Sequence, residues 1–168
     1  YEVFTIKGNQ SYIPKKYTIE GDWSGGAFLL VAGAIGGSLT VDMLSASSTQ
    51  ADKAIIEALK KAGADVTVQH NSISVKKNKL QAFDFNAEEC PDLFPPLVAL
   101  AAHCNGVSAI SGAKRLIYKE SNRAMVLKKE FCNLGIDIDS KDNALIIKGG
   151  KITGGVVHSH NDHRIAMA

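Results

Sequence analysis

The stretch Gly63-Ala-Asp-Val-Thr-Val68 and its later counterpart Gly135-Ile-Asp-Ile-Asp139 decide the fold class. Each follows a stretch with helical spacing, and each precedes a predicted hairpin, a third strand and an acidic residue that opens another helix. Gly63 and Asp92 are 29 residues apart, and Gly135 and Asp162 are 27 apart. The chain therefore contains an internal repeat of about 70 residues, which is longer than the repeats of the common solenoids.

Helices are predicted around both glycines. Apolar residues recur at helical spacing within 51–62 and within 120–134, and a glycine directly after each stretch is a typical helix stop. Two further helices are predicted, one from Asp92 to Cys104 with prolines in its first turn, and one just beginning at Asp162. An aspartate at such a position is usually an N-cap; Asp92 could instead be a base if it faces a cleft.

The segments outside this repeat are consistent with it. A helix is predicted from Gly26 to Ile35, with Asp22 or Ser24 as its N-cap. Strands are predicted at 3–7, 17–20, 38–42, 65–68, 72–75, 80–85, 107–110, 136–138, 144–148 and 156–157. Helices packed on one face of a mixed sheet place the chain in the α+β class. The polar loop 44–50 predicts a domain boundary, with residues 1–43 in one domain and 44–168 in the next.

Composition excludes several classes of protein. Of 168 residues, 45% are hydrophobic and 21% are charged, as in ordinary globular proteins. The longest apolar stretch, Ala27 to Ile35, is too short to cross a bilayer, and no signal peptide is visible. A net charge of +2 is too small to indicate nucleic acid but suits small anions. Three cysteines without a C-x-x-C motif favour a reducing cytoplasm.

The arginines mark candidate anion sites. Only Arg115, Arg123 and Arg164 are arginines among 19 basic residues, and arginine binds carboxylate and phosphate oxygens as a fork. Lys119-Glu-Ser-Asn-Arg123 and Asn161-Asp-His-Arg164 stand at equivalent helix starts, where free N–H groups and the helix dipole favour anions. A capped helix with a Glu120–Arg123 surface pair is the simpler alternative.

The histidines raise the question of a metal. His158, His160 and His163 form an H-x-H-x-x-H pattern, which is no standard structural zinc site and has no cysteine near it. A turn with partly exposed imidazoles is the preferred interpretation, and no metal is predicted.

Together these motifs resemble the 5-enolpyruvylshikimate-3-phosphate synthase family over essentially the whole chain. The matching elements are Lys7-Gly-Asn-Gln-Ser-Tyr12, Glu20-Gly-Asp22, Gln50-Ala-Asp52, Pro91-Asp92, Arg115-Leu-Ile-Tyr-Lys-Glu-Ser-Asn-Arg123 and Asn161-Asp-His-Arg164. The K-E-S-N-R and N-D-H-R strings in this order are the specific ones. The resemblance implies an enolpyruvyl transferase-like fold of six β-α-β-α-β-β units in two domains. Residues 1–43 would end the first domain, and 44–168 would hold two units of the second, truncated at its C-terminus.

The resemblance also implies roles for single residues. Asp92 is expected to remove the proton from the 5-hydroxyl of shikimate 3-phosphate, and Glu120 to act as acid or base near the enolpyruvyl methylene. The expected substrate contacts are Lys119, Asp92 and Tyr1 for shikimate 3-phosphate, and Arg123, Arg164 and His163 for phosphoenolpyruvate. No cofactor is expected, the expected partners are small anionic substrates rather than nucleic acid or membrane, and a monomer is expected.

The chain departs from the family pattern in places. Asn122 stands where aspartate is usual, Gly25 and Gly26 where serine and alanine are usual, and Ala51 where glycine is usual. The family's N-terminal lysine segment, its N-A-G-T-type and serine-rich loops and its C-terminal lysine are expected outside these residues. Three alternatives remain open: a UDP-N-acetylglucosamine enolpyruvyl transferase, a non-catalytic anion-binding module and a zinc hydrolase.

Overall fold

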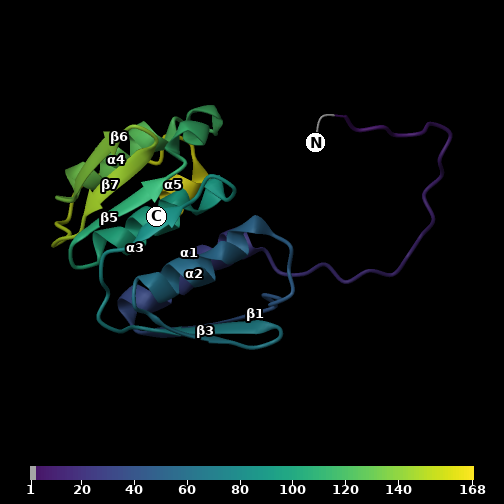
Figure 1. Cartoon of the computed structure of the whole chain (residues 1–168), viewed down its shortest axis with the longest axis horizontal. Coiled ribbons are helices and arrows are strands. Elements are labelled where there is room, and N and C mark those ends of the chain that lie inside the picture. Colours follow the sequence, from purple (N-terminus) through teal and green to yellow (C-terminus); the bar gives the residue numbers. More distant parts are fainter. Residues whose placement is uncertain (1–2) are drawn as a thin grey trace.

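Two β-sheets enclose a layer of helices in the computed structural model, which describes residues 3–168 (Figure 1). The first sheet is antiparallel and has the order β1-β3-β2; the second has the order β4-β5-β7-β6, in which only β4 and β5 are parallel. The strands are β1 (Ser38–Asp42), β2 (Asp65–Val68), β3 (Ser72–Lys76), β4 (Asp84–Asn86), β5 (Val107–Ser111), β6 (Asp137–Lys141) and β7 (Ala144–Lys148). The predicted α+β class with a mixed sheet is confirmed.

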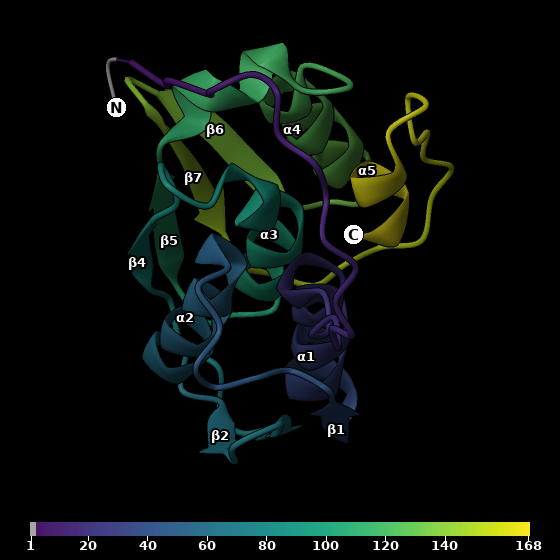
Figure 2. The same ribbon diagram turned by 90° about the vertical axis from the view of Figure 1, so that its right-hand side faces the viewer.

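The helices pack around a central one. They are α1 (Trp23–Gly36), α2 (Ile55–Lys61), α3 (Phe94–Ala102), α4 (Arg123–Asn133) and α5 (His163–Met167), with 3-10 turns at Ala51–Ala54, Pro91–Leu93 and Ala113–Tyr118. All residues of α3 are buried, and Figure 2 shows it between the α1/α2 pair and the α4/α5 pair. Because every face is covered, its sequence is a continuous apolar run. Among residues 3–168 no helix is long and apolar enough to cross a membrane.

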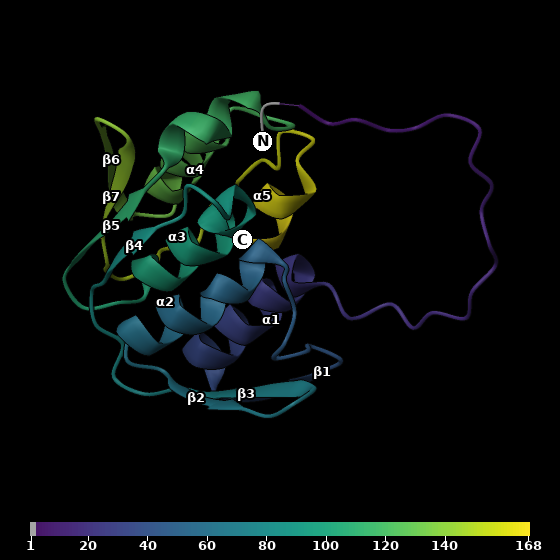
Figure 3. The same ribbon diagram turned by 45° about the vertical axis from the view of Figure 1, so that its right-hand side comes forward.

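The internal repeat is present in space. The order α1-β1-α2-β2-β3 around the first sheet recurs as α3-β5-α4-β6-β7 around the second, and the two sheets stand at an angle with the helices between them (Figure 3). Long-range backbone bonds recur as well: Gln81 N donates to Ala62 O at 2.9 Å, and Thr153 N donates to Leu134 O at 2.8 Å. Each unit that shares a sheet begins with the helix and strand that precede the predicted repeat, α1 and β1 in the first copy and α3 and β5 in the second.

The two glycines that end α2 and α4 have the same geometry. Gly63 has φ +86° and Gly135 has φ +88°, a region that strains other residues. After each glycine a backbone N–H reaches back to the last helical turn, from Ala64 to Leu59 O and from Ile136 to Phe131 O, both at 3.0 Å. This is the Schellman closure, and it confirms the helix ends predicted from the sequence.

The predicted boundary between residues 43 and 44 does not separate two packed units. β1 pairs with β3 over five residues, and α1 packs against α3. The polar loop 44–50 instead secures the start of α1, because Ser48 Oγ donates to Glu20 and Gln50 Nε2 donates to both Glu20 and Gly21 O. Its polar composition therefore reflects local hydrogen bonding rather than a linker.

Three predicted strands are not formed. Residues 3–22 contain no strand, although 3–7 and 17–20 alternate, and the trace runs away from the body of the molecule (Figure 1, Figure 3). Residues 156–157 lie in a loop, and the strand predicted at 80–85 is the shorter β4. An alternating pattern forms a strand only when a neighbouring edge supplies its hydrogen bonds, which a sequence pattern does not show.

Gly149 marks a crossing where two chain segments touch. Its N–H donates to Gly106 O and that of Gly150 donates to Ala102 O, both at 3.0 Å, so these amides satisfy carbonyls at and beyond the end of α3. A Cβ atom on Gly149 would overlap Cys104 O and lie 2.9 Å from Ala101 O. The crossing therefore has no room for a side chain.

Candidate active site

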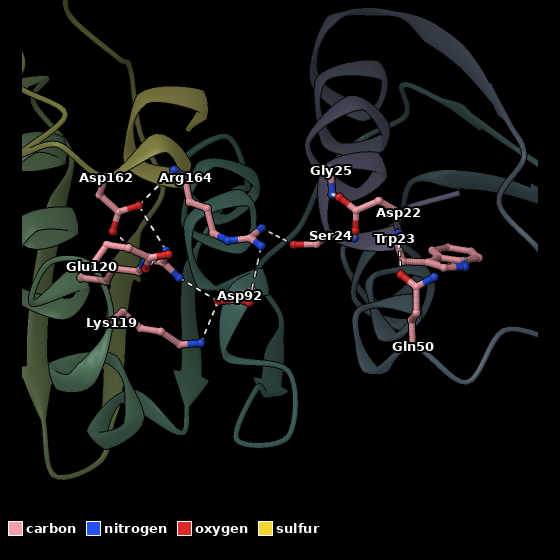
Figure 4. Close-up of polar contacts among 11 residues, drawn as sticks. Asp22, Trp23, Ser24, Gly25, Gln50, Asp92, Lys119, Glu120, Asp162 and Arg164 are labelled. Atoms are coloured by element: carbon pink, nitrogen blue, oxygen red, sulfur yellow. Dashed lines mark hydrogen bonds and ion pairs between the residues drawn. The ribbon is translucent and has the colours of Figure 1, made fainter. Parts of the chain in front are cut away.

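Several helix starts meet at one place, and most of the predicted site residues are there. Arg123 is the first residue of α4 and Arg164 the second of α5, while Asp92 lies in the turn before α3. Lys119 and Glu120 precede α4. Figure 4 shows the side chains of these elements facing one another, with the start of α1 opposite them. The repeat brings this about, because equivalent helices begin at equivalent points.

Arg123 is the centre of the cluster and is fully buried. Its Nε donates to Asp162 Oδ2 at 2.7 Å, Nη1 donates to Asp92 Oδ1 at 2.7 Å, and Nη2 donates to Glu120 Oε2 at 2.5 Å. Burial lowers the pKa of the guanidinium, but hydrogen bonds and charges, first those of Asp162, outweigh burial and raise it. The sequence indicated an anion clamp, whereas here three carboxylates already hold this arginine.

Asp162 joins α5 to this cluster. It is fully buried and is the N-cap of α5, since Oδ1 accepts the N–H of Arg164 at 3.0 Å. Oδ2 also accepts the hydroxyl of Ser121 at 3.0 Å. Burial raises the pKa of this carboxyl, but hydrogen bonds from Arg123 and Ser121 outweigh burial and lower it. The predicted capping role of Asp162 is confirmed.

Asp92 is not an N-cap. No side-chain capping bond is present at this helix start, and the carboxylate instead receives Lys119 Nζ at 2.9 Å and Arg123 Nη1 at 2.7 Å. Arg164 Nη2 lies 3.5 Å from its other oxygen. Burial raises the pKa of Asp92, but the Lys119 hydrogen bond and the charge of Arg164 outweigh it and lower the pKa. The capping interpretation is wrong because three cations draw the carboxylate away from the backbone.

Arg164 links this cluster to α1. Its guanidinium donates through Nη1 to the hydroxyl of Ser24, and Ser24 belongs to the first turn of α1 (Figure 4). Asp22 caps that helix by accepting the N–H groups of Ser24 and Gly25, both at 2.9 Å. Of the two predicted caps, Asp22 is therefore the correct one, and Ser24 is a site residue that sequence reasoning missed.

Asp52 is a second residue missed as a site group. Burial raises the pKa of its carboxyl above the ordinary value, and the charge of Asp92 raises it further, although a hydrogen bond with Ser24 and the charge of Arg164 oppose this. The Gln50-Ala-Asp52 string was noted only as part of a resemblance. Its place in the 3-10 turn before α2, a helix start like the others, is the signal that would have pointed to it.

The other predicted residues are placed differently. Glu120 is half exposed and binds Arg123, so the surface-pair alternative describes only one end of that contact. His163 begins α5 and is exposed, and Tyr1 lies outside the described residues. His160 pairs with Glu130, and residues 3–168 hold no group of three histidine, cysteine or acidic side chains arranged for a metal ion.

The charges at the site are balanced. Lys119, Arg123 and Arg164 oppose Asp92, Glu120 and Asp162 within direct contact distances. An open cavity of about 470 Å³ adjoins this cluster and is lined by Pro91, Lys114, Arg115, Tyr118 and Lys119. An anion that enters from this side meets cations that are positioned by carboxylates, so binding requires exchange of partners rather than capture by free charges.

Known proteins match the chain along its length. The family model described as EPSP synthase (3-phosphoshikimate 1-carboxyvinyltransferase) matches residues 1–168. A 3-phosphoshikimate 1-carboxyvinyltransferase of Clostridium novyi is 45% identical over 100% of this chain and 39% of the relative, and one of Methanosphaera stadtmanae is 44% identical over 95% and 38%. A solved EPSP synthase of Acinetobacter baumannii aligns with a TM-score of 0.80 at 32% identity, over 89% of this chain and 38% of that one.

These matches agree with the family resemblance noted in the sequence. The chain spans 39% of the length of the first of these relatives and 38% of the second. Its mixed sheets and packed helices match the solved synthase fold. The chain belongs to the EPSP synthase (3-phosphoshikimate 1-carboxyvinyltransferase) family.

Proposed function

We propose that this chain supplies part of the active site of an enzyme that transfers the enolpyruvyl group of phosphoenolpyruvate to the 5-hydroxyl of shikimate 3-phosphate and releases phosphate. The names of the relatives support this activity. The structural observation that carries it is the contact of Asp92 with three cations, Lys119, Arg123 and Arg164, where helix starts meet. A base set among such cations suits substrates that carry both phosphate and carboxylate.

The reaction is an addition followed by an elimination. A proton adds to the methylene of phosphoenolpyruvate, and the hydroxyl attacks the resulting cationic carbon while a base takes its proton. Loss of a proton from the new methyl group, with departure of phosphate, restores the double bond. Such chemistry needs an acid, a base and anion clamps, which are the side chains gathered here.

Asp92 is the proposed base for the hydroxyl proton. In the structure its cationic neighbours lower its pKa, which keeps it ionised but makes it a weak base. When Arg123 and Arg164 turn to the anionic groups of the substrates, added negative charge raises the pKa of Asp92 toward the range that a base needs. Lys119, and Tyr1 at the start of the chain, are the proposed further contacts to shikimate 3-phosphate.

Glu120 is the proposed acid and base at the methylene. Its carboxylate contacts Arg123 Nη2, where a substrate carboxylate would also bind. The side chain of Glu120 is 49% exposed, whereas those of Asp92 and Asp162 are 30% and 0% exposed. The most exposed of three competing carboxylates is the easiest to displace. Phosphoenolpyruvate that binds Arg123 and Arg164 therefore releases Glu120 for proton transfer, and His163 at the start of α5 is a further proposed contact.

The remaining groups of the active site are proposed to come from outside residues 1–168, in agreement with the 39% coverage of the Clostridium novyi relative. Because residues 23–168 pack together, we assign them to one domain, and we propose that residues 3–22 connect it to the other domain. The cytoplasm is the proposed location. Burial raises the pKa of the Cys90 and Cys104 thiols to about 11, and unpaired cysteines suit a reducing compartment.

The test is an acceptor assay on the complete protein that contains this chain. We expect phosphate release from phosphoenolpyruvate when shikimate 3-phosphate is added, and none when UDP-N-acetylglucosamine is added. Release with the nucleotide sugar alone would assign the chain to the other enolpyruvyl transfer. Tight phosphoenolpyruvate binding without release with either acceptor would leave an anion-binding module.

A further inference from the structure

Glu130 is a buried carboxylate that the proposed reaction does not use. It lies on α4, its residue is 4% exposed, and both of its oxygens are occupied. Oε1 contacts His160 Nε2 at 2.8 Å, and Oε2 accepts the backbone N–H of His158 at 3.0 Å. These donors belong to the loop that leads to α5, so one carboxylate holds two points of that loop against α4.

The loop so held ends in Asp162. His160 and Asn161 have φ values of +53° and +58°, a left-handed conformation that costs energy in residues other than glycine. The N–H of Asp162 then donates to Ser159 O at 2.9 Å and closes the turn. A strained turn of this kind persists only where its surroundings fix it, and Glu130 supplies two of the bonds that do so.

α4 contacts the turn at two places that share a helix face. Arg123 and Glu130 are seven residues apart, so both point toward the loop from the same side of α4. Arg123 binds the acidic residue of the turn, Asp162, and Glu130 binds its basic residue, His160. The helix thus presents a cation and an anion two turns apart, and the loop presents a carboxylate and an imidazole that bind them.

We infer that Glu130 is a positioning residue which, through His160, fixes the 158–162 turn on α4 and so sets the Asp162 carboxylate against Arg123. The consequence for substrate binding rests on the proposed function, because it takes Arg123 as a ligand clamp. The alignment itself does not, and it is measurable without substrate. Of the three histidines noted in the sequence, His160 thereby has a role in the structure as the partner of Glu130.

The surroundings favour a strong bond between these two groups. A small cavity of about 120 Å³ beside Glu130 is lined mostly by apolar side chains, among them Leu127, Phe131 and Ile165. Hydrogen bonds from His160, and then from His158, lower the pKa of Glu130, so the carboxylate stays ionised at neutral pH. The other titratable groups that face the pair are Lys129, 3.8 Å from Glu130 Oε1, and the ring of His158, 6.3 Å from that of His160.

The test measures the Arg123–Asp162 bond directly, as the exchange rate of the Arg123 Nε proton in NMR spectra of the 168-residue chain. His160→Leu and Glu130→Ala each remove the contact between Glu130 and His160. Both are expected to speed this exchange about tenfold, which corresponds to the free energy typically lost with a hydrogen bond to a charged group. His160→Gln keeps a donor where Nε2 stood and is expected to restore slow exchange. His70→Leu, at the exposed turn between β2 and β3, is the matched control and should change nothing.

The double variant Glu130→Ala/His160→Leu completes a thermodynamic cycle. If the two residues act through each other, exchange in the double variant equals that in either single variant. The inference is overturned if Arg123 Nε exchange stays slow in both single variants, or if His160→Gln behaves like His160→Leu. Amides of the β1–β3 sheet report whether each variant is folded. Absence of transferase activity in the complete protein would refute the proposed function and leave these results untouched.

Discussion

At the scale of the residue, Arg123 carries the clearest prediction for stability. Arg123→Met removes the cation and leaves Asp162 buried without its counter-charge, and such a loss typically costs about 3–5 kcal/mol. The free energy of unfolding is measured by urea denaturation, followed by the fluorescence of Trp23, which is buried and is the sole tryptophan. Lys128→Met breaks the exposed pair with Asp139 and serves as control, with a much smaller expected loss because solvent screens that pair. Equal losses would contradict the central role of Arg123.

Asp92 carries the prediction for catalysis. Asp92→Asn keeps an oxygen acceptor for Lys119 and Arg123 and disturbs no helix cap, so the protein should fold nearly normally. Removal of a general base lowers turnover by about 10²–10⁴-fold. Steady-state kcat of the complete protein is the measurement, with Asp84→Asn on the exposed edge of β4 as control. A near-normal kcat would restrict Asp92 to holding its cationic neighbours.

Residue types alone indicated most of the site residues, but not their burial or their partners. The scarcity of arginine directed attention to Arg123 and Arg164, and the structure brings both to Asp92. The burial of Arg123 could not be predicted, because it depends on carboxylates that are distant in the sequence. Ser24 and Asp52 were missed because a serine or aspartate at a helix start usually serves only as a cap.

At the scale of the element, the first sheet has one strand fewer than the second. β4 runs parallel to β5 and leads directly into α3, whereas no described strand lies on the open side of β1. One bond of the repeat is present, since Gly21 N donates to Met43 O at 2.9 Å just as Ala87 N donates to Ser111 O at 2.9 Å. The register of β4 therefore predicts that residues 17–20 can pair in parallel with β1.

Hydrogen exchange tests this fourth strand. Amides of residues 17–20 should exchange more slowly in the complete protein than in the 168-residue chain, because neighbouring segments hold the strand in place. Ile19→Pro should abolish this protection, since proline removes a ladder donor, and Ile13→Pro in the same exposed segment should leave it intact. Equal exchange of residues 17–20 in the two proteins would contradict the pairing.

Helices were predicted better than strands. Gly63 and Gly135 end their helices as expected, because the left-handed closure is a local requirement. The alternation in 3–7 and 17–20 indicates strands that need partners, and the described residues pair with neither segment. The turn 113–118 was not predicted either; it follows Gly112, whose backbone N–H donates to Asn143 O in the next hairpin.

At the scale of the whole molecule, the acidic residues of the site set the response to pH. The pKa values of Asp92 and Asp162 are lowered in the folded chain. Each therefore contributes stability that is complete above the unfolded pKa of about 4 and is lost as pH falls through the folded value. Asp52, whose pKa is raised, acts in the opposite direction. Urea midpoints should fall below about pH 4, and Asp162→Asn should flatten that fall; an unchanged slope would contradict it.

The isolated chain is expected to bind phosphoenolpyruvate only weakly. Its cations are already paired, and the groups proposed to complete the active site lie outside residues 1–168. We expect the isolated chain to show no transferase activity and to bind phosphoenolpyruvate with a Kd in the millimolar range or weaker, about −4 kcal/mol. Arg123→Lys should weaken even that binding, because lysine lacks the bidentate fork. Calorimetry is the measurement, and micromolar affinity would show that the site is complete as it stands.

The crossing at Gly149 has a consequence for mutational scanning of this family. Every substitution there places a Cβ atom against the carbonyl oxygens of Ala101 and Cys104, so alanine is expected to be tolerated no better than tryptophan. A screen that scores growth would rank this glycine beside Asp92, although it stands at the far end of α3 and touches no proposed substrate. A flat, all-intolerant profile can therefore arise from lack of space, as at Gly149, or from lost chemistry, as at Asp92, and only in the second case does the isosteric variant still fold.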